Sequence, residues 1–77
     1  MKRDNSRHHT SFKKIGGNIK AFRERSGLSQ EELAFRVGST RNYIGCIERA
    51  EKCPSVAFLL DISKALNIHL KDIFNNI

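Results

Sequence analysis

The 77-residue sequence has few of the residues that build disulfide, metal or membrane sites. It lacks an apolar run long enough to cross a bilayer and lacks the apolar segment of a signal peptide, so we expect a cytoplasmic protein. Its two cysteines, Cys46 and Cys53, are expected to be free thiols in a reducing compartment. Together with His8, His9 and His69 they form no recognised ligand spacing. We therefore predict no metal, no cofactor and no small-molecule ligand.

The sequence also lacks the marks of catalysis and of single-stranded RNA recognition. It contains neither a phosphate-cradling glycine loop nor a recognisable grouping of nucleophile, base and orienting residue, so we do not predict an enzyme. Ser29, His69 and Asp72 match a triad by residue type alone, but helix capping and surface charge explain all three. Aromatic residues are only 8% of the chain and are not grouped into a base-stacking platform, which disfavours RNA.

Positive charge is the main compositional feature. The net charge is +6, and residues 1–14 hold five basic residues against one acidic residue, a local net charge of +4. At this size such an excess indicates a polyanionic partner, either nucleic acid or an anionic membrane surface. We interpret residues 1–10 as a basic flexible arm and residues 11–77 as one small domain, whose core gives only a few kcal/mol of stability.

The segment 28–48, LSQEELAFRVGSTRNYIGCIE, predicts two short helices joined by a tight turn. Ser29 and Glu32 have the spacing of a reciprocal capping box, which marks the start of the first helix. Gly38 supplies the positive φ that ends this helix, and Thr40 can cap the next. Together these signals indicate a helix-turn-helix, which carries its second helix into the DNA major groove.

The second helix has two unlike faces. Helical spacing turns Ile44 and Ile47 toward the core and leaves Arg41, Asn42, Gly45, Cys46 and Arg49 on the opposite face. An arginine matches the paired acceptors of guanine, and an asparagine can both donate to and accept from adenine. A solvated helix face is the alternative interpretation, but the capped turn in front of this helix favours DNA reading.

Amphipathic segments flank this unit on both sides. Phe12, Ile15, Ile19 and Phe22 recur at helical spacing from Ser11 onward. Two glycines inside this helix, at positions 16 and 17, cost about 1 kcal/mol each relative to alanine. Either close packing at these positions or weak order near the start of the helix would explain them.

After the central unit, Ser55 can cap a further helix that Asn67 ends, and a short helix follows from about Leu70 to Phe74. The chain end is heavily apolar for a small monomer. We therefore expect a subunit contact formed by Leu70, Ile73, Phe74 and Ile77.

From Ile15 to Phe74, about four-fifths of the chain, the sequence resembles the helix-turn-helix family of phage Cro and repressor proteins. The matching pieces are IGGNIKAFRERSGLSQEELA, VGSTRNYI, IER and PSVAFLLDISKALNIHLKDIF. This resemblance implies an all-α, compact five-helix bundle with a lambda-repressor-like helix-turn-helix. It also implies a positioning helix over 29–37 and a recognition helix over 40–49.

The resemblance further implies roles for individual residues. Bases are expected to meet Arg41, Asn42 and Cys46, and the DNA backbone to meet Gln30, Thr40, Tyr43, Arg49 and Lys52. Gln30 is also expected to brace Arg41. Arg23 and Glu48 match a partly buried ion pair that joins the first helix to the back of the recognition helix.

Two residues depart from the family pattern. Ala50 stands where similar proteins commonly have glycine, and a left-handed backbone there would cost about 1–2 kcal/mol. His69 stands where similar proteins have a small capping residue, which predicts a weakly started last helix.

The length and the RNYI-x-x-IER pattern are most similar to stand-alone regulators. We predict a regulator of transcription that binds a pseudo-palindromic operator in double-stranded DNA as a homodimer beside a promoter, where RNA polymerase is a further partner. A controller protein of a restriction-modification system is the favoured type. A prophage repressor and an antitoxin-type protein-interaction module are the alternatives.

Overall fold

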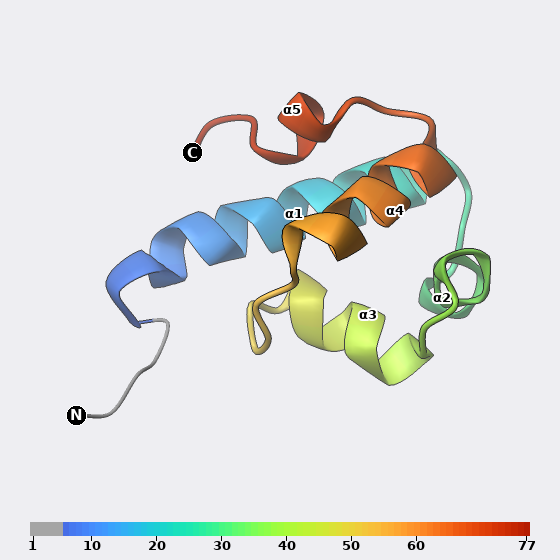
Figure 1. Ribbon diagram of the computed structural model, residues 1–77, viewed down its shortest axis with the longest axis horizontal. Coiled ribbons are helices and arrows are strands. Elements are labelled where there is room, and N and C mark those ends of the chain that lie inside the picture. The colour runs from blue at the N-terminus through green and yellow to red at the C-terminus, as the bar shows by residue number, and fades with distance from the viewer. Residues whose placement is uncertain (1–5) are drawn as a thin grey trace.

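The computed structural model describes residues 6–77, and every regular element in this range is helical. The structure has five α-helices, as the resemblance implied, and a short 3₁₀ helix precedes them. Helices α2 and α3 lie at an angle on one side of α1 (Figure 1). None of the described helices is long and apolar enough to span a bilayer. The elements are η1 (Ser6–His8), α1 (His9–Arg25), α2 (Gln30–Val37), α3 (Arg41–Glu48), α4 (Val56–Leu66) and α5 (Leu70–Ile73).

The first helix begins earlier than the sequence pattern suggested. Residues 6–8 form a 3₁₀ turn and α1 starts at His9, so the predicted flexible arm is wrong for residues 6–10. No glycine or proline interrupts the chain before Gly16, and the His8 ring packs edge-on against Phe12 at 6.3 Å between centroids. The remainder of the predicted arm, residues 1–5, lies outside the described residues.

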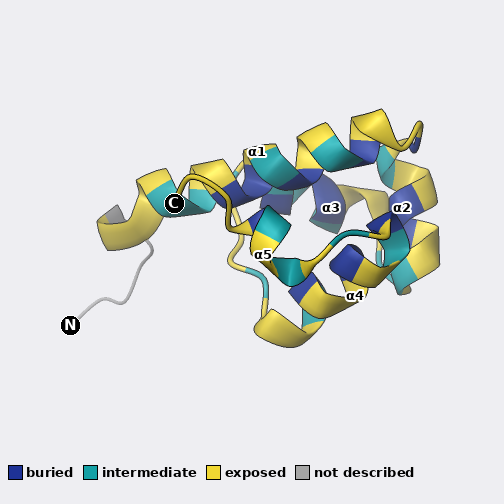
Figure 2. Ribbon diagram, turned by 90° about the horizontal axis from the view of Figure 1, so that it is seen from above, coloured by how far each residue is buried: buried dark blue, intermediate teal, exposed yellow. Residues whose placement is uncertain are grey.

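The core lies among all five α-helices: α2 packs against α3 and α4, and α5 packs against α1 and α4 (Figure 2). Each helix contributes one apolar stripe, as expected for a small domain that must bury most of its aliphatic side chains. The buried apolar residues are Ile15, Ile19, Leu28, Leu33, Ala34, Ile44, Ile47, Leu59, Ile62, Leu66 and Ile73.

The two adjacent glycines of α1 have different environments. A Cβ at Gly16 would lie 2.5 Å from the carbonyl oxygen of Ile47 and 2.6 Å from that of Glu48, whereas a Cβ at Gly17 would meet nothing within 4 Å. Gly16 therefore lets α1 approach the last turn of α3 until backbone nearly touches backbone. Close packing, rather than weak order, accounts for this glycine.

The turn between α2 and α3 has the capping chemistry that the sequence predicted. The Ser29 hydroxyl accepts the Glu32 N–H at 3.0 Å, and the Glu32 carboxylate accepts the Ser29 N–H at 2.8 Å. Gly38 ends α2 with φ 69°, and the Thr40 hydroxyl accepts the Tyr43 N–H at 3.1 Å to begin α3. These bonds are all local, so the geometry of the turn between the two helices depends little on contacts with distant segments.

The chain leaves α3 through a left-handed residue. Ala50 has φ 61°, and the Glu51 N–H closes the turn on the Cys46 carbonyl at 2.7 Å. Glycine is the usual residue in this type of helix ending because it has no Cβ to clash with the following carbonyl. The strain anticipated for Ala50 is therefore present.

Side-chain hydrogen bonds hold both the start and the end of α5. The Asp72 carboxylate accepts the His69 N–H at 3.0 Å, so the acidic residue supports the start of α5. The Asn18 side-chain amide donates to the carbonyls of Ile73 and Asn75 at 2.9 Å each, which joins α5 to α1.

One of the four predicted subunit-contact residues is wrong. Ile73 is fully buried within its own chain because α5 turns it against α1 and α4. Leu70 is half-buried, whereas Phe74 and Ile77 are 37% and 54% exposed. Two apolar residues of α4 are also exposed: Val56, which helical spacing groups with the apolar face of this helix, and Leu60.

Candidate nucleic-acid interface

Helix α3 presents a polar face to solvent and an apolar face to the core. Arg41 and Asn42 are exposed, Cys46 is half-buried, and Ile44 and Ile47 are buried beneath them. Because α2 and α1 both pack against α3, these two helices support α3 from the sides opposite its exposed face (Figure 1). This is the arrangement that a groove-reading helix needs.

Gly45 lies on the outer face of α3, as predicted, but it is buried. A Cβ at this position would lie 2.9 Å from Arg49 Nη1 and 3.6 Å from Gln30 Nε2. Two long polar side chains therefore cover the helix where it has no side chain of its own.

A polar hollow of about 300 Å³ opens beside this glycine. Two arginines, an asparagine and a glutamine supply donors around it without any acidic side chain in its lining, so it suits an electron-rich partner. Its lining residues are Gln30, Arg41, Asn42, Gly45 and Arg49.

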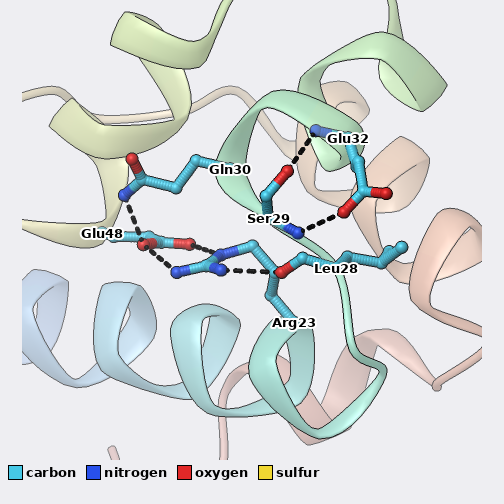
Figure 3. Close-up of polar contacts among 6 residues, drawn as sticks. All are labelled: Arg23, Leu28, Ser29, Gln30, Glu32 and Glu48. Atoms are coloured by element: carbon cyan, nitrogen blue, oxygen red, sulfur yellow. Dashed lines mark hydrogen bonds and ion pairs between the residues drawn. The ribbon is translucent and has the colours of Figure 1, made fainter.

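A buried ion pair secures the back of α3 (Figure 3). Arg23 on α1 donates from Nε to Glu48 Oε2 at 2.6 Å, from Nη2 to Glu48 Oε1 at 3.1 Å, and from Nη1 to the Leu28 carbonyl at 2.8 Å. The two charged side chains are only 8% and 3% exposed. The bonds from Arg23 to Glu48 raise the pKa of this guanidinium above its ordinary value despite its burial. Arg23 therefore stays charged, and its bonds join three segments of the chain.

Gln30 completes this network instead of bracing Arg41. Its Nε2 donates to Glu48 Oε1 at 2.9 Å (Figure 3), so the prediction of a Gln30 to Arg41 brace is wrong. The reason is geometric: the first turn of α2 faces the last turn of α3, where an ionised carboxylate is a stronger acceptor than any group near the start of α3.

The structure places the predicted backbone contacts around the edge of this face. Thr40 and Lys52 are exposed at the start of α3 and beyond its end. Tyr43 is half-buried, and its ring packs edge-on against Phe58 at 5.2 Å between centroids. Arg49 is exposed but paired with Glu51.

Sequence reasoning missed two residues of this region. Glu51 pairs with Arg49 across a turn, a contact that depends on the left-handed backbone at Ala50 and has no periodic signal. Phe35 is 87% exposed on α2 and lies beside Glu31, Glu32 and Arg36. The helical spacing of Leu33, Ala34 and Val37 could have placed Phe35 off the buried face.

No three potential metal ligands gather anywhere in residues 6–77. Cys46 and Cys53 are both free thiols. The hollow on this face is lined by hydrogen-bond donors and two arginines.

Comparison with known proteins agrees with this geometry. The sequence model described as Helix-turn-helix matches residues 19–73. An uncharacterized HTH-type transcriptional regulator, YgzD of Bacillus subtilis, is 39% identical over 56 residues, which cover 73% of this chain and 85% of YgzD. The control protein C.SmaI of Serratia marcescens is 42% identical over 53 residues, which cover 69% of this chain and 63% of C.SmaI.

A solved structure is similar over almost its whole length. The restriction-modification controller protein C.AhdI from Aeromonas hydrophila superposes with a TM-score of 0.84 at 36% sequence identity. The match covers 87% of this chain and 97% of that one. The similarity therefore includes the flanking helices as well as the central turn.

Proposed function

The chain belongs to the helix-turn-helix family of DNA-binding transcriptional regulators, and we propose that it acts as a homodimer on a pseudo-palindromic operator in double-stranded DNA. The observation that carries this proposal is the outward face of α3. Arg41 and Asn42 are exposed there at the mouth of a donor-lined hollow, while Arg23 and Glu48 secure the helix from behind. The cytoplasm, where such DNA lies, is the proposed site of action.

Within this face we assign base contacts and backbone contacts to different residues. Arg41, Asn42 and Cys46 are proposed to meet base edges because they lie on the outer side of α3. The proposed backbone contacts surround them and fix the register of the protein on the duplex. These contacts come from Gln30, Thr40, Tyr43, Arg49 and Lys52.

The proposed dimer contact lies at the C-terminal end of the domain. Phe74 and Ile77 are exposed there, and Leu70 is half-buried beside them. A twofold contact of this kind repeats the same patch on both subunits and places two recognition helices about 34–36 Å apart, one turn of DNA.

A controller of a restriction-modification system is the type that we favour. The support is the similarity to C.AhdI along most of both chains and the identity to C.SmaI. Such a regulator would occupy a site beside a promoter, with RNA polymerase as a neighbouring partner. A prophage repressor would show the same biochemical activity at a different promoter.

Selection of bound duplexes from a random pool tests the proposal. We expect an enriched site with twofold symmetry, bound by two copies of the chain as measured by sedimentation of the complex. Recovery of unrelated sequences, or of asymmetric sites bound by one copy, would contradict it.

A protein-interaction module is the second candidate, and the exposed Phe35 favours it. Such a module would bind a partner protein through α2, and binding would be lost in Phe35→Ala while the selected duplex remained bound. Loss of both activities in this variant would count against a separate surface.

A further inference from the structure

The last helix is too short to hold its own conformation. Helix α5 spans only four residues, Leu70–Ile73, and an isolated helix of this length is not stable in water. Among these four residues only Ile73 is buried, and the chain beyond them passes through Asn76 with a left-handed φ of 66°. Contacts with the rest of the domain must therefore fix the direction of the chain around Phe74.

The Asn18 side chain supplies such a contact on both sides of Phe74. Its Nδ2 donates to the Ile73 carbonyl and to the Asn75 carbonyl, at 2.9 Å each. One amide nitrogen carries two hydrogens, so these two bonds use its whole donor capacity. Because the two carbonyls belong to the residues before and after Phe74, the backbone of Phe74 is held against α1 while the residue stays 37% exposed.

The surface around Phe74 suits a second copy of the chain better than it suits DNA. Residues 68–77 contain one lysine and one aspartate, whose charges cancel, whereas the whole chain has a net charge of +6. Two such chain ends can meet without repulsion between like charges, and they offer little attraction to phosphates. Ile77, which is 54% exposed, and the half-buried Leu70 add apolar surface to that of Phe74.

We propose, on the basis of the homodimer proposed above, that Asn18 is a positioning residue for the subunit contact. It holds the backbone of Phe74 in place in the free monomer, so this segment is ordered during folding rather than during association. A contact surface that is ordered in advance binds more tightly because less conformational entropy is lost on binding. Asn18 thus strengthens the dimer by acting through Phe74.

The test measures the dimer dissociation constant of the wild type, Asn18→Ala and Asn18→Asp by sedimentation without DNA. Asn18→Ala removes both bonds but favours the helical state of α1, since alanine is the better helix former, so a weaker dimer cannot come from a weaker α1. The need to order even one residue on association should raise the dissociation constant about ten-fold. Asn18→Asp places a carboxylate oxygen against the two carbonyls and should raise it at least as much. An unchanged constant in either variant would overturn the proposal.

DNA duplexes separate positioning from a general loss of structure. Asn18→Ala should bind a duplex with a single half-site as the wild type does, because the outer face of α3 is unchanged, but it should bind the full operator more weakly. Equal losses on both duplexes would assign the effect to the whole domain and reject positioning.

Thr10→Ala is the matched control, at an exposed and uncharged polar position of the same helix. It should leave the dissociation constant and both DNA affinities unchanged. A comparably weakened dimer in Thr10→Ala would show that the dimer responds to any change in α1, and this result would also reject a specific role for Asn18.

The proposed dimer fails separately. If the wild type sediments as a monomer even on the full operator, the dimer proposal is wrong and the inference falls with it. If Phe74→Ala dimerises as well as the wild type, the subunit contact lies elsewhere and Asn18 does not position it. If Phe74→Ala weakens the dimer and Asn18→Ala does not, only the inference about Asn18 is wrong. Circular dichroism of each variant verifies folding.

Discussion

Two arginine–glutamate pairs lie at the C-terminal end of α3, and they differ mainly in burial. The Arg23 to Glu48 pair is almost fully buried and shares its carboxylate with Gln30. The Arg49 to Glu51 pair is more than half exposed and joins neighbouring segments of one turn. The two pairs therefore differ in strength: loss of either partner from the buried pair leaves a charge without solvent, whereas water and salt ions can replace either partner of the exposed pair.

The largest expected effect comes from breaking the buried pair. Glu48→Ala leaves the Arg23 charge in a low-dielectric site without its carboxylate and should lower the free energy of unfolding by about 3–5 kcal/mol. Denaturant unfolding followed by circular dichroism measures this change. Glu51→Ala is the matched control, since it removes the exposed partner and should leave the unfolding midpoint nearly unchanged. Equal losses in both variants would refute the distinction between the pairs.

The next largest effect, on stability, is expected from the contact between α1 and α3. Gly16→Ala places a Cβ against two backbone carbonyls that cannot rotate away, at an expected cost of about 1–3 kcal/mol in stability. Gly17→Ala is the control in the next position of the same helix, where open space and better helix propensity should stabilise the protein by about 1 kcal/mol. Thermal unfolding distinguishes the two signs. A stabilised Gly16→Ala variant would mean that α3 is free to move away from α1.

The exposed face of α3 should affect binding rather than folding. Arg41→Ala should cost about 1–3 kcal/mol in operator affinity and relax base preference at one position in each half-site. Arg49→Ala should instead weaken binding to all single-base operator variants alike. Titration of a panel of such variants separates the two behaviours. The assignment of base and backbone roles would be rejected if both substitutions gave the same uniform loss.

The smallest effect concerns the residue between Arg49 and Glu51. Ala50→Gly relieves left-handed strain but adds freedom to the unfolded chain, for a net stabilisation of about 0.5–1 kcal/mol. Ala50→Val should destabilise, because a β-branched side chain tolerates this backbone poorly. Both variants are measured by urea unfolding. Destabilisation by glycine would show that the turn is not strained.

Local chemistry made much of the fold predictable. The capping signals at Ser29, Thr40 and Ser55 each depend on a hydrogen bond three residues away, and all three bonds are present. Helical spacing likewise placed Ile44 and Ile47 in the core. Such features depend on short stretches of sequence and need no knowledge of distant packing.

Packing between distant segments accounts for what the sequence did not indicate. The burial of Ile73 depends on how α5 lies against α1, and the partner chosen by Gln30 depends on where α3 ends. Gly45 and Arg49 were placed on one face by their spacing of four residues, but this spacing does not show that the long Arg49 side chain lies over the glycine and buries it. In the candidate site, the sequence therefore predicted which residues lie on the outer face better than it predicted which side chains they contact.

The close approach at Gly16 has a consequence for how this regulator could change its target. It joins α1 to carbonyl oxygens of Ile47 and Glu48, atoms that every amino acid supplies equally. Outward side chains of α3 can therefore be substituted while the helix keeps the same position against α1. Substitution of the outward residues alone could then change which operator is bound, because the packing of α3 does not depend on them.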